Sequence, residues 1–165
     1  MSTSIGYEHL KAIYFLKDAQ AKAPLAASSA YILPLMAMQS ARLAIEEYVD
    51  QIGRKVDEAW DETNWSDVPM EAQLAHIFQH MGYTLNPEKN VWKEVLTLFE
   101  KANSIQGNLA EMQKLYREEI PEQFKDLAVE YPIYRSQVIA EEAIDILLDM
   151  SDVSSTVKTD VSRTK

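Results

Sequence analysis

The chain has 165 residues, a length that predicts one domain with a core of its own. Hydrophobic residues make up 47% and charged residues 25%, which is ordinary for a globular protein, and the absence of Cys excludes disulfides and thiolate chemistry and favours the reducing cytoplasm. The net charge of −10 opposes non-specific binding to the phosphate backbone of a nucleic acid, and Lys and Arg form no basic run.

Two amphipathic helices are predicted in the first third of the chain. Apolar residues at helical spacing predict the first helix over about 18 residues, ending before Pro24. Ser28 or Ser29 is the expected N-cap of the second helix, whose apolar residues recur at spacings of three and four. Pro34 predicts either a kink or a helix that begins at Pro34 itself. Small residues at positions 37–44 leave room for another backbone to pack closely.

Two further helices are predicted in the middle of the chain. A short helix is expected over residues 70–82, with Gly82 as its C-cap. The next helix is expected over residues 86–104, because Asn86 is a good N-cap and Pro87 suits the first helical position.

The last third of the chain is less regular. Residues 108–121 are either helical or a long connection, and the last helix is expected over residues 132–150. Residues 151–165 are rich in Ser and Thr without periodicity, which predicts a disordered tail. No alternating strand pattern is present. We therefore expect an all-α fold, an antiparallel bundle of about five helices that forms a single domain over residues 1–150.

Candidate metal and cofactor sites are few. His76 and His80 are four residues apart, so they share one helix face and could hold a metal with a third ligand. No Asp or Glu lies one turn away on that face, and the pair is interpreted as a surface pair. The acidic clusters at 46–50 and 141–145 lack the Glu-x-x-His of di-iron bundles, and the glycines form no phosphate-binding loop. We expect no metal and no cofactor.

The stretch from Ala41 to Gly107 resembles the HEPN superfamily of helical-bundle domains. The resemblance rests on "ARLAIEEYVDQIG", "VPMEAQLAHIF" and "NPEKNVWKEVLTLFEKAN". Within the first of these, "AIEEYVD" is similar to a stretch of the family's long helix, and the segment 138–150 is similar to its closing helix. The resemblance covers roughly residues 28–150, and it implies a helical bundle that forms a homodimer.

Catalytic members of that family are metal-independent ribonucleases that use an Arg-Asn pair and a following His. Placed on this sequence, the Arg position is Ala102, the Asn position is Asn103 and the His position is about Gly107. Arg would stabilise charge in the transition state and His would move a proton, and neither Ala nor Gly can do so. Lys101 projects about 100° away around the helix. The resemblance therefore implies no ribonuclease activity.

Three functions are compatible with these patterns. The first is a catalytically inactive HEPN-like domain that acts in protein association as a homodimer through the second helix and the motif helix, in a bacterial defence, stress or toxin–antitoxin context that the resemblance implies. The second is a nucleotide- or RNA-binding protein, a weak or diverged ribonuclease. Its candidate ligand or interface residues are Lys101, Asn103 and Gln106, together with Arg117 or Arg135. The third is an acidic decoy that occupies a basic partner.

The expected location follows from two absences in the sequence. The N-terminal segment lacks the pattern of a signal peptide, and no run approaches the roughly 18 apolar residues needed to span a bilayer. We therefore expect a cytoplasmic protein without membrane contact. Its expected partners are a second copy of the chain and a further protein.

Overall fold

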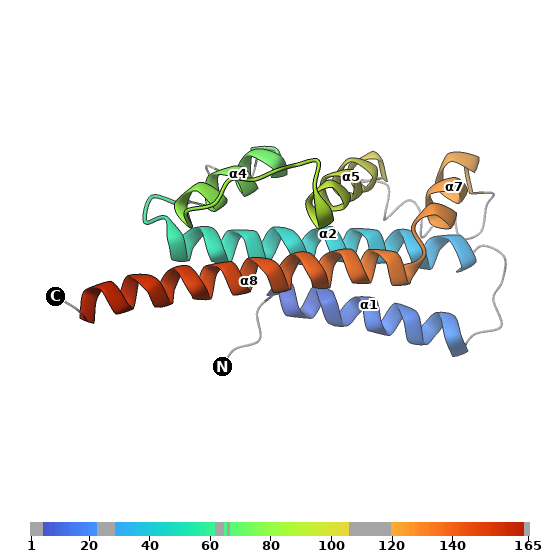
Figure 1. Ribbon diagram of the computed structural model, residues 1–165. Coiled ribbons are helices and arrows are strands. Elements are labelled where there is room, and N and C mark those ends of the chain that lie inside the picture. The colour runs from blue at the N-terminus through green and yellow to red at the C-terminus, as the bar shows by residue number, and fades with distance from the viewer. Residues whose placement is uncertain (1–4, 23–28, 62–64, 66, 106–119, 164–165) are drawn as a thin grey trace.

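The computed structural model describes residues 5–22, 29–61, 65, 67–105 and 120–163 (Figure 1). Within these residues the chain forms six α-helices and no strand. The expected all-α class is confirmed, with six described helices in place of about five. The helices are α1 (Ile5–Lys22), α2 (Ser29–Val56), α4 (Met70–His80), α5 (Asn90–Ile105), α7 (Glu122–Glu130) and α8 (Ile133–Arg163).

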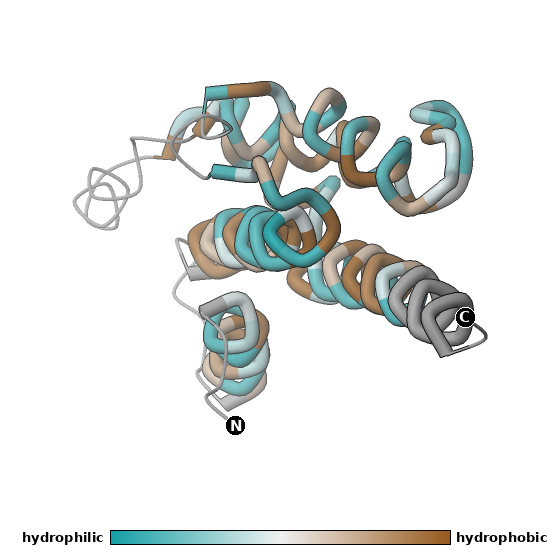
Figure 2. The backbone as a smooth tube through the Cα atoms, turned by 90° about the vertical axis from the view of Figure 1, so that its left-hand side faces the viewer, coloured by the Kyte–Doolittle hydropathy of each residue, from teal (hydrophilic) through white to brown (hydrophobic). Residues whose placement is uncertain are grey.

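The long helix α2 is the centre of the structure. It packs against each of the other five described helices, with α1 and α8 below it and the shorter α4, α5 and α7 above it in Figure 1. The end-on view in Figure 2 likewise shows the short helices on one side of α2 and α1 on the opposite side. The arrangement places every short helix on the side of α2 that faces away from α1.

The direction of α8 differs from the expectation. Figure 1 shows α1 running against α2, but α2 and α8 running in the same direction, so the bundle is not antiparallel throughout. Lys55 at the end of α2 accordingly reaches Asp152 far along α8, with Nζ 3.2 Å from Oδ1. Helix α7 lies beside the starting end of α2 in Figure 1, and α8 begins from there.

The apolar stripe of α2 forms the middle of the core. Its fully buried members include Leu35, Met38, Ile45 and Val49. The small residues Ala37, Ala41 and Ala44 are also fully buried, so they serve packing within the protomer and do not form a surface for a second copy. Gly6 of α1 approaches α2 so closely that an added Cβ would lie 2.6 Å from the Tyr48 ring.

The predicted end of α4 is confirmed. Gly82 has a φ of 85°, the left-handed conformation that glycine adopts without strain. Its N–H donates to the carbonyl of Gln79 (3.1 Å), and the N–H of Tyr83 donates to the carbonyl of Phe78 (2.8 Å). These two bonds are the Schellman arrangement, in which a glycine closes a helix by satisfying its last carbonyls.

Two predicted helix starts need correction or refinement. Helix α2 begins at Ser29 and Pro34 lies inside it, so the helix does not start at the proline. Helix α5 begins at Asn90, four residues after the expected N-cap. Asn86 forms a turn instead, because its Oδ1 accepts from the N–H of Glu88 (3.0 Å) and its carbonyl accepts from that of Lys89 (3.2 Å).

The C-terminal part of the chain contains the largest differences from the expectation. Helix α7 was not predicted; it is short, buries Phe124 and Ala128 four residues apart, and ends just before Pro132. Helix α8 continues to Arg163, so the predicted end of this helix at Met150 is corrected. No Gly or Pro interrupts the chain between Met150 and Arg163, and the backbone can therefore remain helical.

The described helices are amphipathic. Hydrophobic and hydrophilic positions alternate around each tube in Figure 2, and the buried apolar side chains from α1 to α8 form one connected core. No described helix combines the length with the apolar character needed to cross a membrane.

Candidate functional site

The position that the resemblance assigns to the catalytic Arg is closed by packing. Ala102, near the C-terminal end of α5, is fully buried. Its carbonyl accepts a hydrogen bond of 2.8 Å from Nε2 of Gln39 on α2. Because Ala102 has no exposed surface, a long cationic side chain at this position would have to displace the elements packed around α5.

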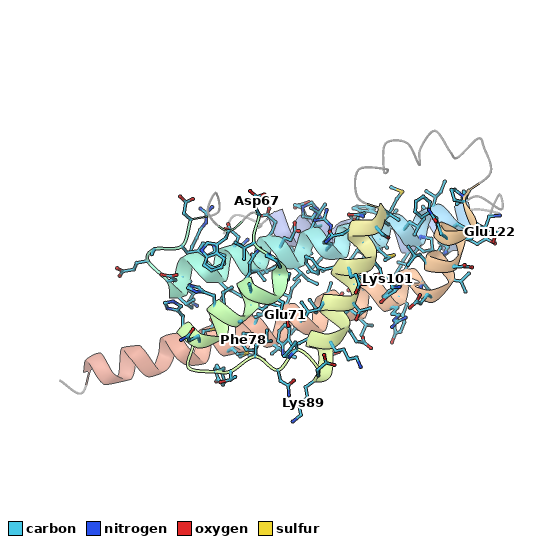
Figure 3. The ribbon with its side chains drawn as sticks, turned by 90° about the horizontal axis from the view of Figure 1, so that it is seen from above. Asp67, Glu71, Phe78, Lys89, Lys101 and Glu122 are labelled. Atoms are coloured by element: carbon cyan, nitrogen blue, oxygen red, sulfur yellow. The ribbon has the colours of Figure 1, made fainter. Side chains whose placement is uncertain are left out.

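The three predicted site residues do not form one group. Asn103 is exposed and lines a cleft, whereas Lys101 lies two positions earlier and therefore projects about 200° away around α5. Asp67 lines the same cleft as Asn103, and Figure 3 shows Lys101 on the opposite side of α5 from Asp67. Gln106, like Gly107, lies outside the described residues.

The two additional arginines do not complete the predicted site. Arg117 lies outside the described residues. Arg135 donates from Nη1 to the carbonyl of Glu130 (2.8 Å), and its guanidinium lies 4.2 Å from the centre of the Tyr131 ring. Arg135 therefore holds the junction of α7 and α8, where the chain turns at Pro132.

A polar cleft of about 360 Å³ lies between α2, α5 and the start of α4. The polar side chains that line it are Arg42, Glu46, Asp67, Gln73 and Asn103. Arg42, which sequence reasoning missed, is almost completely buried; it donates from Nε to Oε1 of Gln39 (3.0 Å) and from Nη1 to Oε1 of Glu46 (2.6 Å). The Arg42–Glu46 spacing of four residues on one helix was the available sequence signal.

The cleft has little capacity for the family's chemistry. Its cation is paired with Glu46, and Asp67 adds a further negative charge, so a phosphate would meet no net attraction. Gln73 uses its Nε2 on the carbonyls of Trp65 (3.1 Å) and Val68 (2.8 Å), which fixes the turn before α4. Among the described lining residues there is no His, Lys, Tyr or Cys to carry a proton.

A second polar cluster lies at the other end of α4. His76 and His80 project from one face of this helix toward Asp57, which follows the last residue of α2. Oδ2 of Asp57 is 2.7 Å from Nε2 of His76 and 3.7 Å from Nε2 of His80. The three residues can bring one ligand atom each to within 4.8 Å of the others. Sequence reasoning missed Asp57 because it lies in the turn after α2, 19 residues before His76.

The turn after α2 holds the Asp57 carboxylate in position. Its second oxygen, Oδ1, accepts from the N–H of Ala59 (2.9 Å). The hydrogen bond with His76 is the main cause that lowers the pKa of the Asp57 carboxyl below its ordinary value, and the bond from Ala59 lowers it further. The carboxylate is therefore ionised at neutral pH and directs Oδ2 to the histidines.

An aromatic wall supports the same cluster. Trp60 and Trp65 stack with their ring centres 4.6 Å apart, and Trp65 lies 4.5 Å from the ring of His76. Nε1 of Trp60 donates to Oδ1 of Asp50 (2.9 Å), which ties the stack to α2. Gly53 makes room for it, because an added Cβ would lie 2.3 Å from atoms of the Trp60 ring.

Comparisons with known proteins assign no family to this arrangement. No protein-family model, no curated protein and no solved structure matches the chain. The six packed helices of the described residues establish the all-α fold class.

Proposed function

We propose that this protein is a catalytically inactive, HEPN-like helical domain that acts by forming a homodimer through one face of α1. The observation that carries the proposal is the exposure of large aromatic side chains on this helix: Tyr7 is 45%, Tyr14 48% and Phe15 69% exposed. Exposed aromatic side chains that gather on one face are typical of protein–protein contact sites.

The surroundings of these aromatics suit a protein contact. Tyr14 and Phe15 line a shallow groove of about 430 Å³ together with Lys11, Lys17 and Asp18. A polar rim around an aromatic centre is the usual composition of an interface. Ile13, on the other side of the helix, is fully buried in the core, and the Tyr14 hydroxyl donates to Glu141 on α8, so Tyr14 lies where the exposed face of α1 meets α8.

The charge of α1 favours a second copy of the chain as the partner. The whole protein carries −10, but the segment Ile5–Lys22 contains three Lys and two acidic residues, and so carries +1. Two copies that meet through α1 therefore avoid most of the repulsion between their acidic surfaces.

The sequence of α1 also suits antiparallel pairing about a two-fold axis. With the axis between residues 14 and 15, Tyr14 meets the partner's Phe15 and Lys11 meets the partner's Asp18. Both contacts occur twice in the dimer, because a two-fold axis duplicates every pair. The register thus joins two aromatic contacts with two opposite-charge contacts.

The closed motif position supports a non-catalytic role. The site where the family's arginine would act holds the buried Ala102, and the nearby Arg42 is already paired with Glu46. Loss of a general acid–base group alone typically lowers a rate by about 10²- to 10⁴-fold. We therefore favour association through the exposed face of α1 over catalysis in the cleft.

Light scattering coupled to size-exclusion chromatography tests the proposal. The wild-type chain is expected to elute as a dimer at tens of micromolar, and Phe15→Glu as a monomer with an unchanged helical circular-dichroism spectrum. Val129→Glu on α7 is the matched control, since Val129 is 73% exposed and lies outside the proposed face. A wild-type monomer, or a Phe15→Glu variant that remains dimeric, would overturn the proposal.

A charge exchange tests the register. Lys11→Glu is expected to weaken the dimer because the new carboxylate faces the partner's Asp18, and Lys11→Glu combined with Asp18→Lys is expected to restore it. The two residues are seven apart on one helix, so they are about 10 Å from each other within one chain and couple weakly there. Failure of the double variant to recover would exclude this register.

A second candidate function rests on the polar cleft. Its volume of about 360 Å³ is within the range of small-molecule sites, and Asn103 and Gln73 could hydrogen-bond a small polar ligand such as a nucleoside. A thermal-shift screen with nucleotides and nucleosides tests it, with Asn103→Ala as the variant. No stabilisation by any ligand at millimolar concentration would remove this candidate.

A further inference from the structure

We infer that Asp57, His76 and His80 form a binding site for a first-row divalent transition metal of the zinc class. The donor set is two imidazoles and one carboxylate. Zinc is bound by this combination where three protein ligands leave a fourth position for water, and iron, cobalt and nickel also accept it. Calcium and magnesium prefer sets made of oxygen atoms alone, so the two histidines select against them.

The distances in the cluster suit such an ion. Donor atoms about 2.1 Å from a tetrahedral zinc lie about 3.4 Å from one another. The separations here are 2.7 Å and 3.7 Å from the Asp57 oxygen to the two Nε2 atoms, and no pair of ligand atoms is more than 4.8 Å apart. The observed values surround the required one, and rotation of the two histidine side chains can equalise them.

The present contact between Asp57 and His76 is compatible with this role. A carboxylate oxygen 2.7 Å from Nε2 requires a proton between the two atoms, and the ionised Asp57 can only accept it. A metal ion would replace that proton and bring the neutral imidazole nitrogen and the carboxylate to the same cation. A neutral imidazole would then carry its proton on Nδ1, which leaves the lone pair of Nε2 available to the metal.

The supporting contacts hold the donors in place before any metal arrives. Oδ1 of Asp57 is fixed by the N–H of Ala59, so Oδ2 is the oxygen that faces both histidines. The ring of Trp65 lies 4.5 Å from that of His76 and supports it from one side. Fixed second contacts of this kind orient metal ligands and raise the affinity of a site.

The cluster is also accessible. The side chain of Asp57 is 12% exposed, that of His76 30% and that of His80 39%, so exposure increases from the carboxylate outward. An ion can enter past His80, and its remaining coordination position would face solvent. A metal bound here would link the turn after α2 to α4, which the Asp57–His76 hydrogen bond already joins.

Zinc binding to the tag-free protein, treated with chelator and dialysed, tests the inference. Competition with a chromophoric chelator is expected to show one zinc per chain. Cobalt is expected to give the intense visible absorption of a four-coordinate ion, and copper to quench the tryptophan emission because Trp65 lies 4.5 Å from His76.

Three variants locate the site. His80→Gln, His76→Gln and Asp57→Asn are each expected to lower the zinc affinity at least tenfold and to abolish the cobalt absorption. His9→Gln, which changes the remaining histidine of the chain, is the matched control and is expected to change neither.

Two results would overturn the inference. One is the absence of zinc binding up to 100 times the protein concentration while the circular-dichroism spectrum stays native. The other is zinc binding that none of the three variants weakens, which would place the metal elsewhere. His80→Gln is the decisive variant, because His80 is the most exposed of the three residues and its replacement leaves the core unchanged.

Discussion

Each of the two polar sites at the ends of α4 joins a carboxylate to nitrogen-bearing side chains, but with different results. At the start of the helix, the buried Arg42 donates to Gln39 and forms an ion pair with Glu46, so its charge is neutralised inside the protein. At the end, one oxygen of Asp57 faces two imidazoles that are partly exposed to solvent. The comparison teaches that burial separates the two clusters. Arg42 is buried and paired, which suits a structural role, whereas His80 is partly exposed and can reach a ligand from solvent.

The largest loss of stability is expected from removing Arg42, the centre of the polar site at the start of α4. Arg42→Ala removes the donor that links Gln39 to Glu46, and Glu46 remains 38% exposed, so hydration offsets part of the loss. We expect a decrease of about 2–3 kcal/mol in the free energy of unfolding, measured by urea denaturation. Arg54→Ala, which alters an exposed ion pair with Asp50, should cost less than about 1 kcal/mol. Equal losses in the two variants would contradict the structural role of Arg42.

A smaller loss of stability is expected from crowding the second site. Gly53→Ala places a methyl 2.3 Å from the Trp60 ring, and we expect a cost of about 1–3 kcal/mol together with weaker zinc binding. Gly6→Ala is the control, because it crowds Tyr48 in the same way but lies outside the metal cluster. It should lower stability without changing zinc affinity; if both variants alter zinc binding, the effect is general and not local.

His80→Gln sharpens the comparison from the other side. Since His80 is 39% exposed, we expect its replacement to change the free energy of unfolding of the metal-free protein by no more than about 0.5 kcal/mol. The same substitution is expected to remove most of the zinc affinity. Thermal unfolding in chelator and in zinc separates the two effects, and a large loss in chelator would assign His80 a structural role like that of Arg42.

The smallest expected effect is a change of stability with pH in the metal-free protein. Folding lowers the pKa of Asp57 below its ordinary value of 3.8, so the carboxylate contributes stability above that value. The contribution is lost as the pH falls through the lower pKa of the folded state. Urea denaturation of the wild type and Asp57→Asn, compared between about pH 6 and pH 2, should show their difference shrinking in acid. A constant difference would exclude the carboxylate as its source.

The helical class and several boundaries were predictable because they depend on local chemistry. The stripe of α2 and the glycine that closes α4 need only the spacing of apolar residues and the conformational freedom of Gly82. Helix α7 was missed because it is short and buries only Phe124 and Ala128, which is too few positions to define a helical period. The parallel direction of α8 depends on how the chain returns across α2, and no local pattern encodes that path.

The candidate sites were less predictable for the same reason. The surface pair His76 and His80 was visible in the sequence, but its acidic partner comes from the turn after α2. Arg42 and Asn103 likewise come from different helices, and only the packing of α2 against α5 brings them to one cleft. Lys101 was expected beside Asn103, yet the helical rotation between them separates the two side chains.

The central position of α2 has a consequence for how the chain must assemble. Its apolar stripe is made early during synthesis, but α8, which covers one side of it, is made last of the described helices. A nascent chain that ends before Ile133 therefore exposes that side to water and to other nascent chains, a condition under which proteins aggregate or recruit chaperones. We therefore expect chains truncated within α8 to be less soluble than the full chain.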